Sequence, residues 1–368
     1  DEAFTPLGDA LDKLETDYPL QPFSPDYFDA STPLLSTSEP YARGALASLG
    51  AREAPPPFLA HALPVEAASD GPVDLRELSR FLQHPAQALV EGRLGIRPPR
   101  ELEPLSDREP LLPGGLERYQ IAQPLLAPAI RGVALEELWG ALRASGQLPA
   151  GVTGRCVFEE LAPLVADVAE AVRPLLEGEA LEPVAAHVEL PAGAVHGWLS
   201  SLWPGGQVLY RFAKLQAKHE LDAWVRHLVL CAAAHDAPLL PTRTLLVGRH
   251  PRMRRAIVVA FDPVADAVDR LSELTGLLER GRHELVPLVP TASMAYVRAR
   301  QSRRDSESWR VNLAQQRVDD LAAEDAAWGL ALRGAPPLVA RSSGDDGFCG
   351  VARRVFEPLL EARTEVRR

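Results

Sequence analysis

The stretch VHGWLSSLWPGGQVLYRFAKLQA, residues 195–217, decides the fold class of the chain. Apolar side chains alternate with other residues on both sides of the Gly205–Gly206 pair, which indicates two β-strands joined by a tight turn. The same alternation begins upstream, at Val184, Ala186, Val188 and Leu190. We therefore expect a three-stranded meander over residues 184–215.

Helical periodicity encloses these strands. Residues 158–178 have an amphipathic pattern, and residues 218–235 return to the helical period. The apolar positions of the first of these helices are Leu161, Leu164, Val165, Val168, Val172 and Leu175. Two more strands are predicted at 243–248 and 256–261. The order of a helix, three strands, a helix and a further strand predicts an α+β core, with a mixed sheet flanked by helices.

Additional N- and C-terminal helices are predicted on either side of this core. Asp74 can cap a helix over residues 75–96, with Pro85 expected to break or bend it. Its apolar positions are Leu75, Leu78, Leu82 and Leu89. Helical patterns also cover 115–126, 134–146 and much of the chain from 265 onward. The predicted division is an extended arm and linker at 1–57, a helical subdomain at 58–157, the core at 158–262 and a C-terminal helical part at 263–368.

The composition limits the classes of function. The net charge of −11 argues against a protein that coats nucleic acid over its whole surface, although a local basic track remains possible. Three widely spaced cysteines favour a reducing cytoplasm over a disulfide framework. Residue 1 is Asp, no leader pattern follows it, and no apolar run is long enough to span a bilayer, so we expect a cytoplasmic piece of a longer protein.

Sequence motifs for cofactor chemistry are missing. The chain has neither the Gly-x-x-x-x-Gly-Lys-Ser/Thr loop of nucleotide-binding proteins nor a Gly-x-Ser-x-Gly nucleophile motif, and we expect no cofactor. His227, Cys231 and His235 recur every four residues, so one helix could present them to a metal ion, but a fourth ligand is not evident. We favour the alternative that Cys231 is a core residue, with the histidines at the edge of the buried face.

Two basic segments are candidates for DNA binding. Residues 298–310 contain Arg298, Arg300, Arg303, Arg304 and Trp309, which could grip phosphates and stack on a base. The alternative is a solvated helix end whose arginines pair with Asp305 and Glu307. The second segment, RHPRMRR at 249–255, contributes Arg252, Arg254 and Arg255 at a predicted hairpin tip.

The opening stretch has the strand pattern of a nuclease core but not its chemistry. Hydrolysis of a phosphodiester needs carboxylates to hold Mg²⁺ and a lysine near the attacking water. The corresponding positions hold Ser200, Tyr210 and Phe212. Arg211 and Lys214 have no acidic partner in the strand, and Glu189 alone cannot hold a metal. We therefore expect no metal site and no catalysis.

Six segments, in the same order along nearly the whole chain, carry a resemblance to one family. They are YPLQPFSPDYF (18–28), LRELSRFLQHPAQALVEGRLGI (75–96), LERYQIAQPLL (116–126), LRASGQLPAGVTGRCVFEEL (142–161), FAKLQAKHELDAWVRHLVLCAA (212–233) and VARRVFEPLLE (351–361). The chain resembles the C-terminal portion of the RecC family, the gamma subunits of bacterial exodeoxyribonuclease V.

The resemblance implies a degenerate PD-(D/E)xK restriction-endonuclease-like core, similar to the nuclease of the RecB partner but inactive. It places Ser200 at the first acid, Tyr210 at the second and Phe212 at the lysine. It also implies RecB and RecD, DNA ends and separated strands as partners. Chi recognition belongs to helicase-like domains of the family that this sequence lacks.

Two classes of function follow, together with a third possibility. The first is a non-catalytic scaffold and DNA-guiding domain of the RecBCD helicase–nuclease complex, in double-strand break repair and recombination. The second is a PD-(D/E)xK-type nuclease whose metal ligands have migrated, to Glu179, Glu182 or Glu189. The third is an assembly domain that touches no DNA. Acids that converge within metal reach on the central strands would favour the nuclease.

Overall fold

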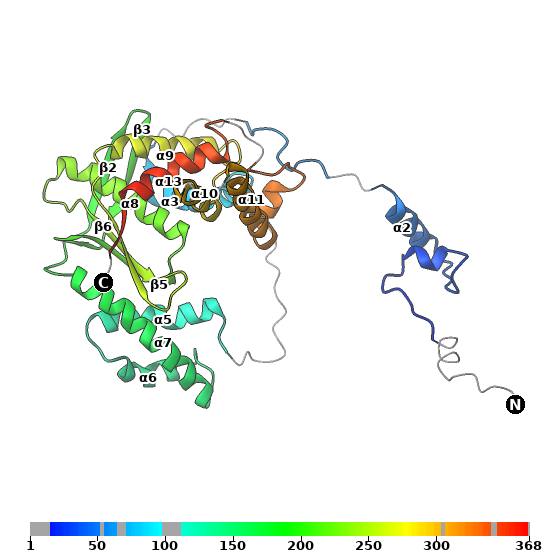
Figure 1. Cartoon of the computed structure of the whole chain (residues 1–368), viewed down its shortest axis with the longest axis horizontal. Helices are drawn as coiled ribbons and strands as arrows, with labels where there is room; N and C mark the ends of the chain where they lie inside the picture. Colours follow the sequence, from blue (N-terminus) through cyan, green and yellow to red (C-terminus); the bar gives the residue numbers. More distant parts are fainter. Residues whose placement is uncertain are drawn as a thin grey trace. The chain divides into compact units, whose positions relative to one another are not determined.

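The computed structural model describes residues 15–51, 55–64, 71–97, 112–302, 306–339 and 344–366. The chain divides into two compact units, Asp1–Pro55 and Pro56–Arg368. Each is described by itself (Figure 1).

The described part of the first unit is partly helical. A 3-10 turn, η1 (Pro25–Phe28), begins after Ser24, whose hydroxyl accepts a hydrogen bond from the Asp26 N–H. Helix α2 spans Glu39–Leu49, which the prediction of an extended arm did not include. The Tyr27 hydroxyl donates to the Pro19 carbonyl at 2.9 Å, so aromatic residues of this segment pack within the unit itself.

The second unit contains two mixed β-sheets flanked by helices, which confirms the predicted α+β class. The first sheet has the order β1-β3-β2, built from β1 (Val73–Asp74), β2 (Val184–Leu190) and β3 (Gly193–Leu199). β2 and β3 form an antiparallel hairpin, whereas β1 runs parallel to β3. The Val188–Val195 pair of this hairpin is buried, as the alternation predicts.

The second sheet has the order β4-β5-β6-β7-β8. Its strands are β4 (Leu202–Trp203), β5 (Gly206–Lys214), β6 (Thr244–Arg249), β7 (Ala256–Phe261) and β8 (Arg363–Val366). β5 and β6 are parallel and are joined by helix α8 (Ala217–Asp236), the crossover that parallel neighbours require. The other pairs are antiparallel.

The predicted meander over 184–215 is wrong, because the chain changes sheets after β3. Ser201 has a φ of 59°, in the left-handed region, and the strand ends there. The turn at Gly205–Gly206 then joins β5 to the two-residue strand β4 and not to β3. Gly206 has a φ of 150°, and a side chain at this position would approach the Arg243 carbonyl oxygen to 2.8 Å, which explains glycine in this turn.

The helix over 75–96 is interrupted where proline predicts it. Helix α3 (Leu75–Gln83) is capped by the Asp74 carboxylate and ends at His84; the short α4 (Pro85–Gln87) and a π-helical segment (Ala88–Arg93) follow. The four leucines predicted on its apolar face are buried. Three further helices lie between α4 and β2, namely α5 (Gly115–Ile130), α6 (Leu135–Ala144) and α7 (Gly151–Val172), in the described part of the chain, and α7 begins before the predicted residue 158.

The C-terminal part is helical until its last strand. Its helices are α9 (Ala267–Gly281), α10 (Pro290–Ser302), α11 (Glu307–Glu324), α12 (Ala326–Leu332) and α13 (Phe348–Ala362). The final strand β8 pairs with β7. Residues 263–368 therefore complete the sheet of residues 158–262, and the four-part division of the chain stays a prediction.

Two hydrophobic cores meet on the five-stranded sheet. The first core lies on one face, where α8 contacts β6, and also includes the three-stranded sheet and residues of α3, α9, α10 and α13; the second packs α5 and α7 against the other face. In Figure 1, α5, α6 and α7 lie together below β5, and α9, α10 and α13 lie on the opposite side. Successive residues of β7 alternate between the cores: Ile257 and Val259 belong to the first, Val258 and Ala260 to the second.

We predict that Gly197→Ala destabilises the fold, because helix α3 lies directly on strand β3. A Cβ at Gly197 would stand 2.6 Å from the Leu75 Cβ, an atom that cannot swing away. The expected loss is about 1–3 kcal/mol in the free energy of unfolding, measured by urea denaturation. Gly205→Ala, where a new Cβ meets nothing within 4 Å, is the matched control. Equal stability of the two variants would contradict the packing described for α3.

Candidate functional site

Tyr210 and Phe212 lie on the face of β5 that α5 and α7 cover. Both belong to the second core, where Phe212 is 1% exposed. The Phe212 N–H donates to Gln123 Oε1 of α5 at 2.7 Å, and the guanidinium of Arg249 lies 4.7 Å from the Phe212 ring centroid. The two positions are thus part of an apolar, helix-covered surface, which offers a divalent cation no carboxylate.

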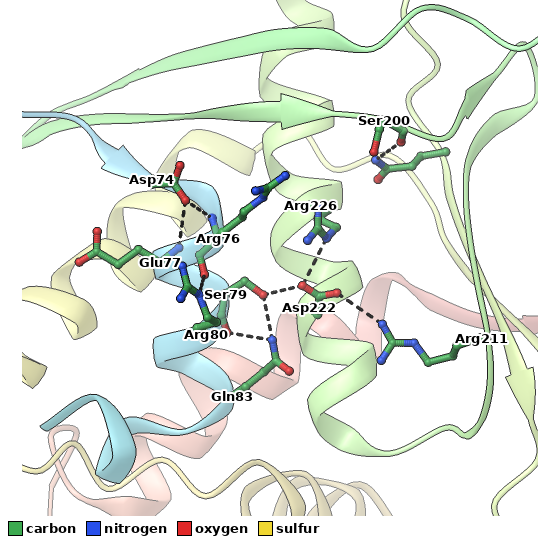
Figure 2. Close-up of polar contacts among 11 residues, drawn as sticks. Asp74, Arg76, Glu77, Ser79, Arg80, Gln83, Ser200, Arg211, Asp222 and Arg226 are labelled. Carbon is green, nitrogen blue, oxygen red and sulfur yellow. Dashed lines mark hydrogen bonds and ion pairs between the residues drawn. The ribbon is translucent and has the colours of Figure 1, made fainter. Parts of the chain in front are cut away.

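Ser200 is an exposed residue in the link between β3 and β4. Its backbone carbonyl accepts a hydrogen bond from the Gln207 side-chain amide at 3.0 Å (Figure 2). The next carbonyl, of Ser201, accepts from the Val208 N–H at 2.9 Å. The serine therefore helps to close the β4–β5 turn through its main chain, and it lies outside the cluster that holds Tyr210 and Phe212.

The carboxylates considered as migrated metal ligands do not gather. Glu179, Glu182 and Glu189 are all exposed, and Glu189 accepts from His187 at 2.9 Å. Within the described ranges, no three His, Cys, Asp or Glu side chains lie close enough together to hold a metal ion. The described geometry therefore gives the nuclease alternative no support.

The three residues of the possible metal set on α8 have three different environments. His227 is fully buried, Cys231 is half-buried and His235 is exposed. His227 Nε2 donates to the Asp262 carbonyl at 3.0 Å, which leaves Nδ1 to accept from the Thr244 hydroxyl at 3.1 Å. Burial lowers the pKa of His227 to about 4, so the ring is a neutral bridge between α8 and the sheet. Its full burial differs from the predicted place at the edge of the buried face.

Arg298 and Arg300, in the first basic segment, both pair with carboxylates of the fold. Arg298 contacts Glu220 of α8 at 3.3 Å, and Arg300 contacts Glu357 of α13 at 3.4 Å. Arg363 also contacts Glu220, at 2.8 Å, so this carboxylate, 4% exposed, has two arginine partners. These partners differ from Asp305 and Glu307, which the alternative interpretation named.

The other described residues that were considered in the first basic segment lie at the start of helix α11. Trp309 is 47% exposed at the start of α11. Glu307 pairs with Arg310 at 3.1 Å, as the alternative interpretation predicts for this carboxylate. Arg303, Arg304 and Asp305 lie outside the described residues.

The second basic segment forms the tip of the β6–β7 hairpin, and its three predicted arginines are exposed. Arg255 pairs with Glu365 of β8 at 3.3 Å. Arg254 lies 3.8 Å from Glu160 of α7. The Arg252 backbone N–H donates a hydrogen bond to His250 Nδ1 at 3.1 Å, and Arg252 is exposed at the hairpin tip.

Two arginines that were not predicted as site residues, Arg118 and Arg249, lie near Arg254 and Glu160. Arg118 of α5 donates two hydrogen bonds to Glu160, at 2.9 and 2.6 Å, and Arg249 ends β6 beside Phe212. We refer to Arg118, Arg249 and Arg254 as the arginine cluster. Arg249 could have been found, because it begins the RHPRMRR segment. Arg118 could not, because it stands alone in a helix far away in the sequence.

Charge within the arginine cluster is unbalanced. The pKa of the Glu160 carboxyl is lowered, above all by the hydrogen bonds from Arg118. The pKa of Arg249 is lowered as well, by burial and then by the like charges of Arg254 and Arg118. One carboxylate therefore faces three guanidinium groups.

A second polar cluster surrounds Asp222 of α8 (Figure 2). Its carboxylate accepts from Ser79 of α3 at 2.5 Å and contacts Arg226 at 3.2 Å and Arg211 of β5 at 3.9 Å. Arg211, which has no acidic partner in its own strand, thus finds one on the helix that follows. The cluster joins α3, β5 and α8, and we assign it to the fold.

In the described part of the chain, every helix is too short or too polar to span a lipid bilayer.

Together these features define a helix-flanked α+β domain in which Tyr210 and Phe212 pack in an apolar core, whereas Ser200 is exposed. Residues 70–301 match the family model of the RecC C-terminal domain. The chain belongs to the RecC family.

Curated relatives agree with this assignment. The chain is 27% identical to the RecBCD enzyme subunit RecC of Mycobacterium tuberculosis over 98% of its own length and 35% of the relative's. It is 32% identical to the RecC subunit of Escherichia coli over 44% of the chain and 14% of that protein. It is 28% identical to RecC of Mycolicibacterium smegmatis over 81% of the chain and 27% of that protein. The chain thus spans about a third, or less, of these relatives.

We predict that Glu220→Gln costs about 3 kcal/mol of unfolding free energy, because a buried carboxylate is removed from between two arginines. Arg298→Gln should cost less, since Arg363 still pairs with Glu220 and the Arg298 side chain is 46% exposed. Chemical denaturation at neutral pH measures both losses. A larger loss for Arg298→Gln than for Glu220→Gln would contradict this order.

We also predict that stability falls as the pH drops from about 6.5, the ordinary pKa of histidine, toward 4. The pKa of His227 is lowered to about 4 in the folded state, so over this range the unfolded chain binds a proton that the folded chain does not. His227→Gln should therefore reduce the slope of unfolding free energy against pH by up to about 1.4 kcal/mol per pH unit. Burial also lowers the pKa of His219 to about 4, so part of the slope remains.

The exposed His235 supplies the control for this measurement. His235→Gln should leave the slope unchanged, and a His227→Gln variant with the parental slope would refute the buried neutral state of His227.

Proposed function

We propose that the chain is a non-catalytic scaffold and DNA-guiding domain of the RecBCD helicase–nuclease complex, in double-strand break repair and recombination. The observation that carries the proposal is the placement of Tyr210 and Phe212 beneath α5, in an apolar core. Metal-dependent hydrolysis needs carboxylates at such a site. Membership of the RecC family supports the place in the complex.

We further propose that the core is a degenerate PD-(D/E)xK restriction-endonuclease-like fold. The chain order of α7, β2, β3, β4, β5, α8 and β6 supports this proposal, because it differs from the predicted order of one helix, three strands, a helix and a strand only by the two-residue strand β4. The parallel pairing of β5 with β6 through α8 also supports it. The change of sheet after β3 is the main departure from a simple meander.

The proposed partners are RecB, RecD, DNA ends and the separated strands, in the cytoplasm and without a cofactor or membrane. The proposed DNA contacts include Arg252, Arg254 and Arg255 at the hairpin tip, together with Arg298, Arg300, Arg303, Arg304 and Trp309. The ion pairs of Arg298 and Arg300 give these two residues a part in the fold as well.

Catalytic silence is the direct prediction of this function. The purified chain, incubated with Mg²⁺ or Mn²⁺, should leave linear duplex and single-stranded DNA intact, since Ser200, Tyr210 and Phe212 provide no metal cage. Gel analysis of end-labelled DNA measures this. Cleavage that disappears when Glu179, Glu182 or Glu189 is replaced by Gln would establish the nuclease alternative instead.

Association with the partner subunits tests the scaffold role separately. The net charge of −11 leads us to expect protein contacts to dominate, with weak DNA binding that declines as salt rises. The chain is mixed with RecB, with RecD and with a forked DNA, and all affinities are measured in one buffer. Tight DNA binding at physiological salt without subunit association would reverse this order, and binding to neither would defeat the proposal.

A further inference from the structure

The arginine cluster has the composition of an anion-binding surface. Arg118 reaches it from α5, and Arg249 and Arg254 reach it from the β6–β7 hairpin. Arg252, at the hairpin tip, adds a fourth cation, which is exposed. Within the described part of the chain, Glu160 of α7 is the carboxylate that pairs with Arg118 and Arg254. The excess of positive charge is local, in a chain whose net charge is −11.

The contacts of the three arginines show which guanidinium groups can bind an incoming anion. Arg118 forms a bidentate ion pair with Glu160, so its guanidinium already has a carboxylate partner. Arg254 is 3.8 Å from the same carboxylate and its side chain is 70% exposed. Arg249 packs on the Phe212 ring, and among the described residues no carboxylate lies within ion-pair distance of it. Arg249 and Arg254 are therefore the two cations that an incoming anion would neutralise.

We propose that Arg249, packed on the Phe212 ring, and Arg254, at the exposed hairpin, bind the phosphodiester backbone of a DNA strand directly. This inference rests on the DNA-guiding function proposed above and gives it a location. Phe212 stands at the position where the nuclease pattern places its lysine. At this place the chain binds the phosphate through guanidinium groups, without a metal ion and without cleavage.

Exposed aromatic and apolar side chains on the same elements favour a single DNA strand over a duplex. Tyr119 follows Arg118 in α5 and is 36% exposed, and Met253, 52% exposed, lies between Arg252 and Arg254. Tyr119 is also one helical turn before Gln123, which contacts the main chain of Phe212. Exposed aromatic and apolar side chains on the elements that carry the arginines can contact unstacked bases next to phosphates. A duplex, with its bases paired and stacked, would leave these side chains unused.

The test measures the binding of a fluorescent 20-nucleotide oligo(dT) to the full chain by anisotropy at several salt concentrations. Arg249→Gln with Arg254→Gln should weaken binding about tenfold at low salt, because two charge-assisted contacts are lost. The slope of log affinity against log salt should decrease by about 1.4, since each phosphate contact on a single strand contributes about 0.7. Arg254→Glu alone, at a largely exposed position, repeats the test without touching Phe212.

For Glu160→Gln we expect stronger and not weaker binding of oligo(dT). This variant therefore distinguishes a role of the arginines in binding DNA from a role in stabilising the fold. It removes the negative charge that pairs with Arg118 and Arg254, so affinity for oligo(dT) should rise severalfold. The matched control is Arg353→Gln with Arg354→Gln in α13, where both arginines pair with exposed aspartates, Asp345 and Asp346. This control should bind oligo(dT) like the parent.

Three results would overturn the proposal. The first is an unchanged salt slope in the Arg249 and Arg254 variants while the parent still binds DNA. The second is loss of RecB or RecD binding in these variants with DNA binding intact, which would make the cluster a protein interface. The third is displacement of oligo(dT) by millimolar inorganic phosphate or pyrophosphate, which would indicate a site for a free anion. Catalytic silence stands in each case, because it does not depend on these arginines, and the scaffold role is tested separately by the binding of the parent chain to RecB and RecD.

Discussion

Strands β6 and β7 are buried on both faces, and this double burial constrains the rest of the globular unit. Every residue of β7 is buried, and successive side chains enter two different cores. A sheet whose central strands are apolar on both faces must be covered by helices on both sides. Helix α8 and the C-terminal helices cover one face, and α5 and α7 cover the other (Figure 1).

The covering of the second face has a chemical consequence. A catalytic site on this face of β5 would need water, carboxylates and an entrance, whereas Tyr210 and Phe212 face an apolar layer of helices. The apolar residues at Tyr210 and Phe212 are consistent with coverage by α5, because a buried unpaired carboxylate or lysine would be costly there. Charged side chains lie at the rim of this layer, where Arg249 lies over the Phe212 ring and Arg254 lies near Glu160.

Local signals made much of this fold predictable. Asp74 as a helix cap, the break at Pro85 and the period-two pattern of β2 and β3 depend on neighbouring residues, and the sequence shows them directly. The change of sheet after β3 depends on a left-handed Ser201, a conformation that serine rarely adopts, so the pattern alone favoured a continuous meander. The pairing of Arg118 with Glu160 and of Arg298 with Glu220 joins distant segments, and no local pattern predicts such pairs. For the same reason Arg118 was missed in the candidate site.

The edges of the five-stranded sheet determine how a neighbouring protein can recognise it. One edge is the two-residue strand β4, and the other is β8, four residues contributed by the end of the described chain. Short edge strands offer few free N–H and C=O groups for an additional strand. β8 also occupies the edge of β7, whose length and apolar composition would otherwise invite strand addition and aggregation. Recognition of this sheet by other chains must then depend on side chains, hairpin tips and helix surfaces, and not on main-chain hydrogen bonding between strands.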